Sequence, residues 1–137
     1  MRSATDALAV EGFDAAIERA HAYEAAGADV IFVEAPTSEA EIEAIAKRVT
    51  APKLINMFQG GKTPLVPLAK LREWGYRIVI IPSDLQRAAI RAMEDTLGAI
   101  ARDGNSAAVA DRMASFNERE GAVDTTAWLE LDRRYST

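Results

Sequence analysis

Cysteine is absent from this chain of 137 residues, and histidine occurs only once. Without cysteine the chain contains no disulfide, no thiolate metal site and no cysteine nucleophile. No apolar run approaches the length of about 18 residues that a membrane-spanning helix needs, and the first residues lack the apolar core of a signal peptide. Basic residues do not cluster, and the net charge is −5, which disfavours binding to nucleic-acid phosphates. We therefore expect a cytoplasmic protein that binds neither membranes nor nucleic acids.

Apolar residues make up 49% of the sequence, which is enough to bury one hydrophobic core. Neither a linker nor a low-complexity tract divides the chain, so a single domain over residues 1–137 is expected. Within it, residues 1–104 alternate between strand and helix patterns, and residues 105–137 form a C-terminal helical segment.

Three short apolar runs predict β-strands, each followed by a polar turn and a helical pattern. They cover residues 29–34, 53–57 and 76–81. A run that is apolar throughout, such as Val30-Ile31-Phe32-Val33, is typical of parallel strands that are buried on both faces. The recurring order of strand, loop and helix predicts an α/β fold with a parallel sheet.

Apolar residues at spacings of three and four predict the helices that follow and precede these strands. Ser38 and Glu41 fit a capping box, in which the hydroxyl and the carboxylate bond each other's backbone amides. Glycines mark most of the helix ends. The predicted helices cover residues 13–26, 38–49, 67–74 and 82–102. Two further amphipathic helices are predicted over residues 106–113 and 126–135, joined by a turn at residues 119–121.

Polar residues at the start of the long helix have structural interpretations. Ser83 and Asp84 are expected to cap it. Arg87 lies one turn further on. It either faces the mouth of a site or pairs with Glu94 or Asp95, and the ion pair is the preferred interpretation.

Two predicted strands end in residues that can bind or react. Glu34 follows four apolar residues, and a carboxylate at the end of a strand can take a proton or bond a substrate hydroxyl. The alternative is a carboxylate that caps the following loop. Asn56 offers both a donor and an acceptor and can recognise a carboxylate without adding charge. Its alternative is a turn residue ahead of Gly60.

The segment 56–63 comes close to a phosphate-binding loop, whose pattern is Gly, four residues, Gly-Lys-Ser/Thr. Its first position is Asn56 instead of glycine, and Pro64 follows the threonine. Without the first glycine the loop loses the tight backbone nest that holds phosphate. We therefore reject nucleotide binding.

Six segments, in order and over nearly the whole chain, resemble the isocitrate lyase/phosphoenolpyruvate mutase superfamily. The resemblance is closest to its branch of methylisocitrate lyases, dimethylmalate lyases and carboxyphosphonoenolpyruvate mutases. The matching segments are residues 5–7 (TDA), 12–20 (GFDAAIERA), 25–29 (AAGAD), 31–35 (IFVEA), 56–57 (NM) and 60–64 (GGKTP).

The resemblance implies a (β/α)8 TIM-type barrel whose C-terminal helix is exchanged between neighbouring subunits. The segments correspond to the C-terminal half of that barrel, with about three complete strand–helix units followed by C-terminal helices. A complete barrel takes about 250 residues, so 137 residues form part of one. We expect that a missing N-terminal half or a homo-oligomer completes it.

The resemblance also implies a magnesium-dependent carbon–carbon lyase that acts on 2-hydroxy or 2-oxo di- or tricarboxylates through an enolate. The family's metal-binding aspartates and its catalytic cysteine belong to the half that this sequence lacks. We therefore expect this chain to be inactive by itself. Mutase- or decarboxylase-like chemistry is an alternative, as is an inactive half-barrel that serves as an oligomeric binding or structural module.

For individual residues, the resemblance implies that Glu34 is catalytic and that Asn56 and Thr63 bind the substrate. Ala4 stands where the family has an arginine that binds a substrate carboxylate. Arg2 lies two residues away on the same strand face, which makes it a candidate replacement.

Phe58 stands where methylisocitrate-type enzymes carry a threonine. A phenyl ring cannot donate the hydrogen bond that a hydroxyl donates. Substrate specificity is therefore expected to differ at this position.

Overall fold

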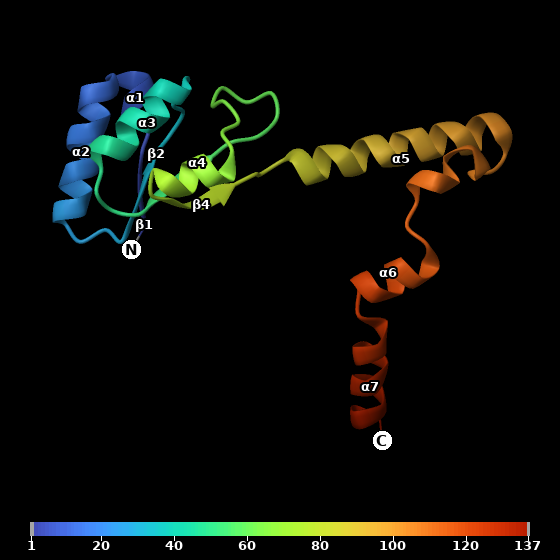
Figure 1. The fold of residues 1–137 in the computed structure, drawn as a ribbon. Coiled ribbons are helices and arrows are strands. Elements are labelled where there is room, and N and C mark those ends of the chain that lie inside the picture. The colour runs from blue at the N-terminus through green and yellow to red at the C-terminus, as the bar shows by residue number, and fades with distance from the viewer. Residues whose placement is uncertain (1, 137) are drawn as a thin grey trace. The chain divides into compact units, whose positions relative to one another are not determined.

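The structure is a computed structural model that describes residues 2–136, apart from the side chain of Arg2. It consists of two compact units, Met1–Arg87 and Ala88–Thr137, which are drawn in Figure 1. The first unit contains the sheet and the second contains helices. Each unit is described by itself.

The first unit is built on a parallel sheet of four strands in sequential order. The strands are β1 (Arg2–Thr5), β2 (Val30–Val33), β3 (Lys53–Asn56) and β4 (Tyr76–Ile80). Three of them were expected from the apolar runs, and the sheet confirms the predicted α/β fold. Thr5 pairs with Val33, and Asn56 pairs with Ile80. All four strands therefore end at the same edge of the sheet.

Helices lie between and after these strands in the first unit, as Figure 1 shows. Those between the strands are α1 (Ala7–Val10), α2 (Phe13–Ala25), α3 (Glu39–Arg48) and α4 (Leu68–Glu73). Gly27 and Gly75 follow α2 and α4 with φ of 87° and 81°. Because side chains are strained in this left-handed region, glycine is the residue that ends a helix in this way.

The start of α3 differs in one detail from the predicted capping box. The Ser38 hydroxyl accepts a hydrogen bond from the Glu41 amide at 3.1 Å, as expected. The Glu41 carboxylate, however, accepts from the amide and the hydroxyl of Thr37, at 2.6 and 3.1 Å. Two donors of Thr37 thus take the place of the single Ser38 amide. The bond to the Ser38 hydroxyl is confirmed, and the predicted partner of the Glu41 carboxylate is wrong by one residue.

The core lies between the sheet and its helices and has two parts. One part contains Ile17, Ile31 and Val49, and the other contains Ile55 and Leu71, together with further buried residues. Helix α3 supplies side chains to both, since Ile45 belongs to the first and Ile42 to the second. The two parts therefore share one helix.

The sheet is covered less completely than the sequence predicted. In β2, Ile31 and Val33 are buried, whereas Val30 and Phe32 are only half-buried. This alternation means that one face of the strand packs on helices and the other does not. Burial of β2 on both faces is therefore not seen among the described residues. On β4, Ile80 is 38% exposed.

Lys53 is a buried cation at the start of β3, with 4% of its surface exposed. Its ammonium group donates to the carbonyls of Val49 at 3.0 Å and Ala51 at 3.2 Å. These carbonyls follow α3, where a positive charge also complements the helix dipole. Burial lowers the pKa of Lys53, and Glu24 opposes this effect.

Tyr76 lies beside Lys53, at the same end of the sheet. Its ring centroid is 6.0 Å from the Lys53 Nζ, and its hydroxyl donates to the Ile42 carbonyl at 3.0 Å. Burial raises the pKa of Tyr76. Together the two side chains tie the amino-terminal end of the sheet to α3.

The second unit consists of the rest of α5 (Asp84–Asp103), a 3-10 helix η1 (Ala107–Arg112), and helices α6 (Phe116–Ala122) and α7 (Thr125–Tyr135). The predicted turn at residues 119–121 is wrong, because these residues lie inside α6.

A capping box begins α6. The Ser115 hydroxyl accepts from the Glu118 amide, and the Glu118 carboxylate accepts from the Ser115 amide. This pattern was visible in the sequence and outweighs the glycine at position 121.

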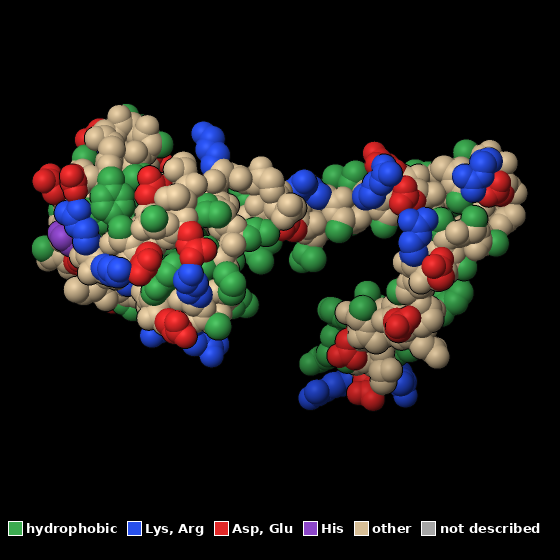
Figure 2. Space-filling view, turned by 45° about the horizontal axis from the view of Figure 1, so that its top comes forward, with side chains coloured by type: hydrophobic (Ala, Val, Ile, Leu, Met, Phe, Trp, Pro, Cys, Tyr) green, Lys and Arg blue, Asp and Glu red, His purple; other side chains and the backbone are tan. Residues whose placement is uncertain are grey.

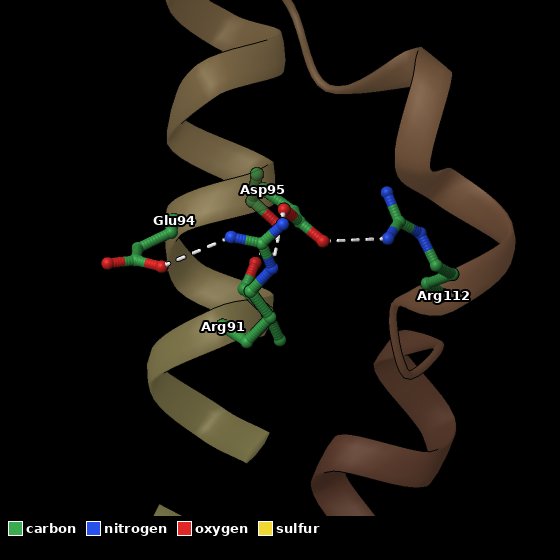
Figure 3. A network of polar contacts seen from close by, with 6 residues as sticks. Arg91, Glu94, Asp95 and Arg112 are labelled. Atoms are coloured by element: carbon green, nitrogen blue, oxygen red, sulfur yellow. Dashed lines mark hydrogen bonds and ion pairs between the residues drawn. The ribbon is translucent and has the colours of Figure 1, made fainter. Parts of the chain in front are cut away.

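The ion pair predicted for Arg87 is formed by Arg91 instead. Figure 3 shows Arg91 between Glu94 and Asp95, at 3.6 and 3.4 Å. Asp95 also accepts from Arg112 at 2.9 Å, which joins α5 to η1. The spacing from Arg91 to these carboxylates is three and four residues, which places them on one helix face.

Apolar side chains lie exposed along α5 and on the later helices, as the green atoms in Figure 2 show. Four on α5 follow a spacing of three and four residues and are 44–66% exposed: Ile90, Met93, Leu97 and Ile100. Such a stripe normally packs on another element. No helix within residues 2–136 is long and apolar enough to cross a membrane.

Replacing Lys53 by alanine is expected to destabilise the first unit by about 2 to 3 kcal/mol, because it leaves a cavity and two carbonyls without a donor. Lys53→Met fills the space and loses only the hydrogen bonds, so its cost is expected to be about 1 kcal/mol. Urea unfolding measures both values. Equal stabilities of Lys53→Ala and the wild type would show that the buried ammonium contributes nothing.

Candidate functional site

A cavity of about 240 Å³ lies at the carboxyl-terminal edge of the sheet. It is bounded by residues that follow β2 and by the loop that follows β3. Its lining consists of Glu34, Ala35, Asn56, Phe58, Gly61, Lys62 and Thr63. The structure thus brings together three residues that the sequence predicted for a site, Glu34, Asn56 and Thr63.

The fourth predicted residue, Arg2, is described only by its backbone. It pairs with Val30 at the start of β1, and its side chain lies outside the described part of the chain. Its role in substrate binding stays a prediction.

Glu34 is positioned by the pairing of β1 with β2. Its amide donates to the Thr5 carbonyl at 3.0 Å, which continues the ladder by one residue past β2. The next residue, Ala35, has a φ of 59°. A residue other than glycine pays roughly 1–2 kcal/mol in this left-handed region, and such strain concentrates at functional sites.

The environment of Glu34 favours its protonated form. Burial raises the pKa of this carboxyl, and the negative charge of Asp6 raises it further. Among residues 2–136, no donor bonds the Glu34 carboxylate, so the loop-capping alternative has no hydrogen bond to support it. A carboxyl with a raised pKa is suited to exchange a proton with a ligand.

Asn56 ends β3 beside this carboxyl. Its side-chain oxygen is buried and has no hydrogen-bond partner among the described residues. Buried acceptors almost always have a donor. The cavity therefore contains an amide that a bound ligand could satisfy.

The loop after β3 forms the opposite wall. The Gly61 amide donates to the Phe58 carbonyl at 3.0 Å, which closes a tight turn. The Phe58 ring lies against Gly61, where an added Cβ would be 3.1–3.2 Å from three ring atoms. A larger residue at this position would require the Phe58 ring to shift by a few tenths of an ångström. Thr63 follows and is 7% exposed.

The sequence and the fold of this chain both resemble those of known proteins. The family described as phosphoenolpyruvate phosphomutase matches residues 4–101. The chain belongs to this family.

Relatives within this superfamily agree with the match. 2,3-Dimethylmalate lyase from Eubacterium barkeri is 38% identical over 133 residues, which are 97% of this chain and 46% of that protein. 2-Methylisocitrate lyase from Aeropyrum pernix is 46% identical over 114 residues, covering 83% of this chain and 37% of that protein. The chain therefore spans less than half the length of these relatives.

Solved structures of family members have the same fold. A 2,3-dimethylmalate lyase structure superposes with a TM-score of 0.82 at 28% identity, over 97% of this chain and 46% of that one. A phosphonopyruvate hydrolase in complex with oxalate and Mg²⁺ superposes with a TM-score of 0.79 at 25% identity, over 99% of this chain and 49% of that one. The predicted family and the predicted half of a TIM-type barrel are thereby confirmed.

Sequence reasoning missed two residues at this edge of the sheet. Asp6 follows β1 as Glu34 follows β2, and it acts on Glu34 through its charge. Its position at a strand end was a usable signal, but no apolar run marks β1, so the three predicted strands did not include it. Ala35 was missed because nothing in its residue type indicates a positive φ.

Potential metal ligands do not gather into a cluster among the described residues. No group of three or more His, Cys, Asp or Glu side chains in residues 2–136 is placed to hold a metal ion. Asp6 and Glu34 are two carboxylates that interact through their charge, and Mg²⁺ can be held by one or two carboxylates together with waters and substrate oxygens. Because no cluster of three such side chains is found among the described residues, we assign the metal no ligand among them.

Glu34→Gln is expected to stabilise the chain at pH 7.5 by about 0.5 to 1 kcal/mol, because it removes a half-buried charge beside Asp6. The pKa of Glu34 is raised from 4.5 in the folded chain, so the folded state binds the proton more tightly. Unfolding free energy therefore falls as pH rises from 4.5 through the raised pKa. The gain should vanish near pH 4, where the wild-type carboxyl is protonated.

Urea unfolding at the two pH values measures this difference. The control is Glu18→Gln, which changes an exposed carboxylate on α2 and should alter stability little at either pH. A Glu34→Gln variant that is less stable than the wild type at pH 7.5 would contradict the role of charge burial.

Proposed function

We propose that this chain is the C-terminal part of a carbon–carbon lyase that cleaves 2-hydroxy di- or tricarboxylates. The observation that carries the proposal is the meeting of Glu34, Asn56 and Thr63 around one cavity. It is supported by relatives that are 2,3-dimethylmalate and 2-methylisocitrate lyases.

The proposed reaction moves one proton at each end of the broken bond. The substrate hydroxyl loses its proton as it becomes a carbonyl, the adjacent carbon–carbon bond breaks, and its electrons form an enolate on the departing carboxylate fragment. That enolate carbon then takes a proton. Glu34 has a raised pKa and is the group of this chain that can hold or deliver such a proton.

Asn56 and Thr63 are proposed to orient the substrate. The free oxygen of Asn56 can accept a hydrogen bond from the substrate hydroxyl, while its amide nitrogen can donate to a carboxylate. The Thr63 hydroxyl lies on the same cavity. Fixing the hydroxyl beside the cleaved bond lowers the entropy lost on reaching the transition state.

The other half of the barrel is proposed to complete both the fold and the site. One face of β2 is only half-buried, and the residues described here lack a metal cluster. Mg²⁺, which accompanies oxalate in the related phosphonopyruvate hydrolase structure, would neutralise developing oxyanion charge. It would be held by residues outside this chain.

The deciding experiment isolates the protein from its own source and measures its mass by native mass spectrometry. The same preparation is then tested for release of a 2-oxo acid from 2-methylisocitrate and from 2,3-dimethylmalate, with magnesium and with chelator. A mass near that of a full barrel together with magnesium-dependent release supports the proposal. A self-associated chain of 14.8 kDa subunits without activity would favour the alternative of an oligomeric half-barrel.

In the complete enzyme, Glu34→Gln is expected to lower kcat by about 100-fold or more, as expected for loss of a proton-transfer group. Substrate binding should change little, because the amide keeps the shape of the side chain. Steady-state kinetics measure this, with Glu18→Gln as the control. Wild-type turnover by Glu34→Gln would assign the carboxyl a purely structural role.

Phe58→Thr is expected to raise kcat/KM for 2-methylisocitrate relative to 2,3-dimethylmalate by about tenfold. The phenyl ring lines the cavity and donates no hydrogen bond, so a third carboxylate is poorly accommodated beside it. A hydroxyl could bond that carboxylate, which dimethylmalate lacks. The control is Phe58→Leu, which keeps an apolar wall, and an equal shift in that variant would contradict recognition by hydrogen bonding.

A further inference from the structure

The loop between β3 and α4 is held by its backbone at one residue, Gln59. The Gln59 amide donates to the Asp84 carboxylate at 3.2 Å. The Gln59 carbonyl accepts from the Arg87 guanidinium at 2.5 Å. Both backbone polar groups of one residue are therefore bound by side chains that are 25 and 28 residues away in sequence.

The two side chains that bind Gln59 form one unit. Asp84 and Arg87 are three residues apart at the start of α5, and their charged atoms are 3.5 Å apart. Arg87 therefore aligns the carboxylate that binds the Gln59 amide, and Asp84 aligns the guanidinium that binds the carbonyl. Such charge-assisted hydrogen bonds are stronger than bonds between neutral groups.

Gln59 lies inside the loop that forms a wall of the cavity. It directly follows Phe58 and precedes Gly61, and both of these line the cavity. The loop is also fixed at its start, where the Met57 amide donates to the Ile80 carbonyl at 3.0 Å. After Met57, two hydrogen bonds to Gln59 join this loop to the start of α5.

The predicted roles of Asp84 and Arg87 do not account for these bonds. Asp84 was expected to cap α5, but one of its oxygens binds the loop, and the other is buried without a hydrogen bond among the described residues. Arg87 was expected to pair with Glu94 or Asp95, but Arg91 forms those pairs. Arg87 pairs with Asp84 instead and also donates to the Gln59 carbonyl. This contact with the loop supports the alternative in which Arg87 faces the mouth of a site.

We infer that Asp84 and Arg87 are positioning residues that set the place of the 58–63 loop, and with it the width of the cavity beside Glu34. The expected effect on substrate binding rests on the proposed function. The hydrogen bonds that hold the loop do not depend on it, because they lie within this chain.

The first test measures hydrogen exchange of the Gln59 amide by NMR in the full chain. Asp84→Ala removes the acceptor and Arg87→Ala removes the donor to the carbonyl. Both are expected to speed exchange at Gln59 by about tenfold or more, because protection depends on the local hydrogen bond. Asp84→Asn, which keeps an acceptor, should speed it less.

The matched control is Arg91→Ala, which removes an arginine and its ion pairs one turn further along α5. It should leave exchange at Gln59 unchanged. Unchanged exchange in both Asp84→Ala and Arg87→Ala would overturn the inference, as would an equal effect of Arg91→Ala. Should Asp84→Ala fail to fold, Asp84→Asn and Arg87→Lys still give the comparison.

The second test uses the complete enzyme and separates positioning from mere stability. A displaced loop weakens contacts to the substrate in the ground state and transition state alike, so KM should rise about tenfold while kcat stays within about threefold. Loss of folded protein would instead lower kcat and leave KM unchanged. Arg87→Lys, which keeps a donor, should restore part of the lost affinity.

The two tests also distinguish this inference from the proposed function. A complete enzyme without lyase activity would refute the proposed function, while the exchange at Gln59 would still decide whether Asp84 and Arg87 hold the loop. Altered exchange with an unchanged KM would show that the loop is held but that its place does not affect the cavity.

Discussion

The parallel register of the four strands is the constraint on which the rest of the first unit depends. Because Thr5 pairs with Val33 and Asn56 pairs with Ile80, each strand ends at the same edge. Residues that follow different strands are thereby brought close in space although they are far apart in sequence. The register also brings two carboxylates together, and this proximity contributes to the raised pKa of Glu34.

The carboxyl-terminal edge carries several unfavourable features, and the opposite edge carries favourable ones. Ala35 has a strained backbone, and the Glu34 side chain is half-buried. Asn56 has a buried oxygen without a donor among the described residues. At the amino-terminal end of the same strand β3, Lys53 binds two carbonyls. A strand of four residues thus has a hydrogen-bonded lysine at one end and the cavity at the other.

Local patterns were sufficient for three of the four strands, for most helices and for singling out Glu34 and Asn56, because periodicity and strand ends are visible in short windows. Thr63 was named only through the family resemblance. Local patterns failed where two local signals competed. Gly121 suggested a break, yet Ser115 and Glu118 cap a helix that runs through it. The bonds from Gln59 to the start of α5 could not be predicted, because they join residues at least 25 positions apart, and only the folded register brings these segments together.

The proposed function divides the work of the barrel between this chain and its missing half. The residues described here offer a carboxyl with a raised pKa, an amide and a hydroxyl around one cavity, and no cluster of metal ligands. In that proposal, orientation of a substrate depends on where these groups lie, which the sheet register and the Asp84–Arg87 pair determine within the first unit. Neutralising the developing charge with a metal would depend on ligands from outside the described residues. Positioning of a substrate and stabilisation of developing charge are physically separate contributions to catalysis, so a partial barrel could hold the groups for the first without those for the second.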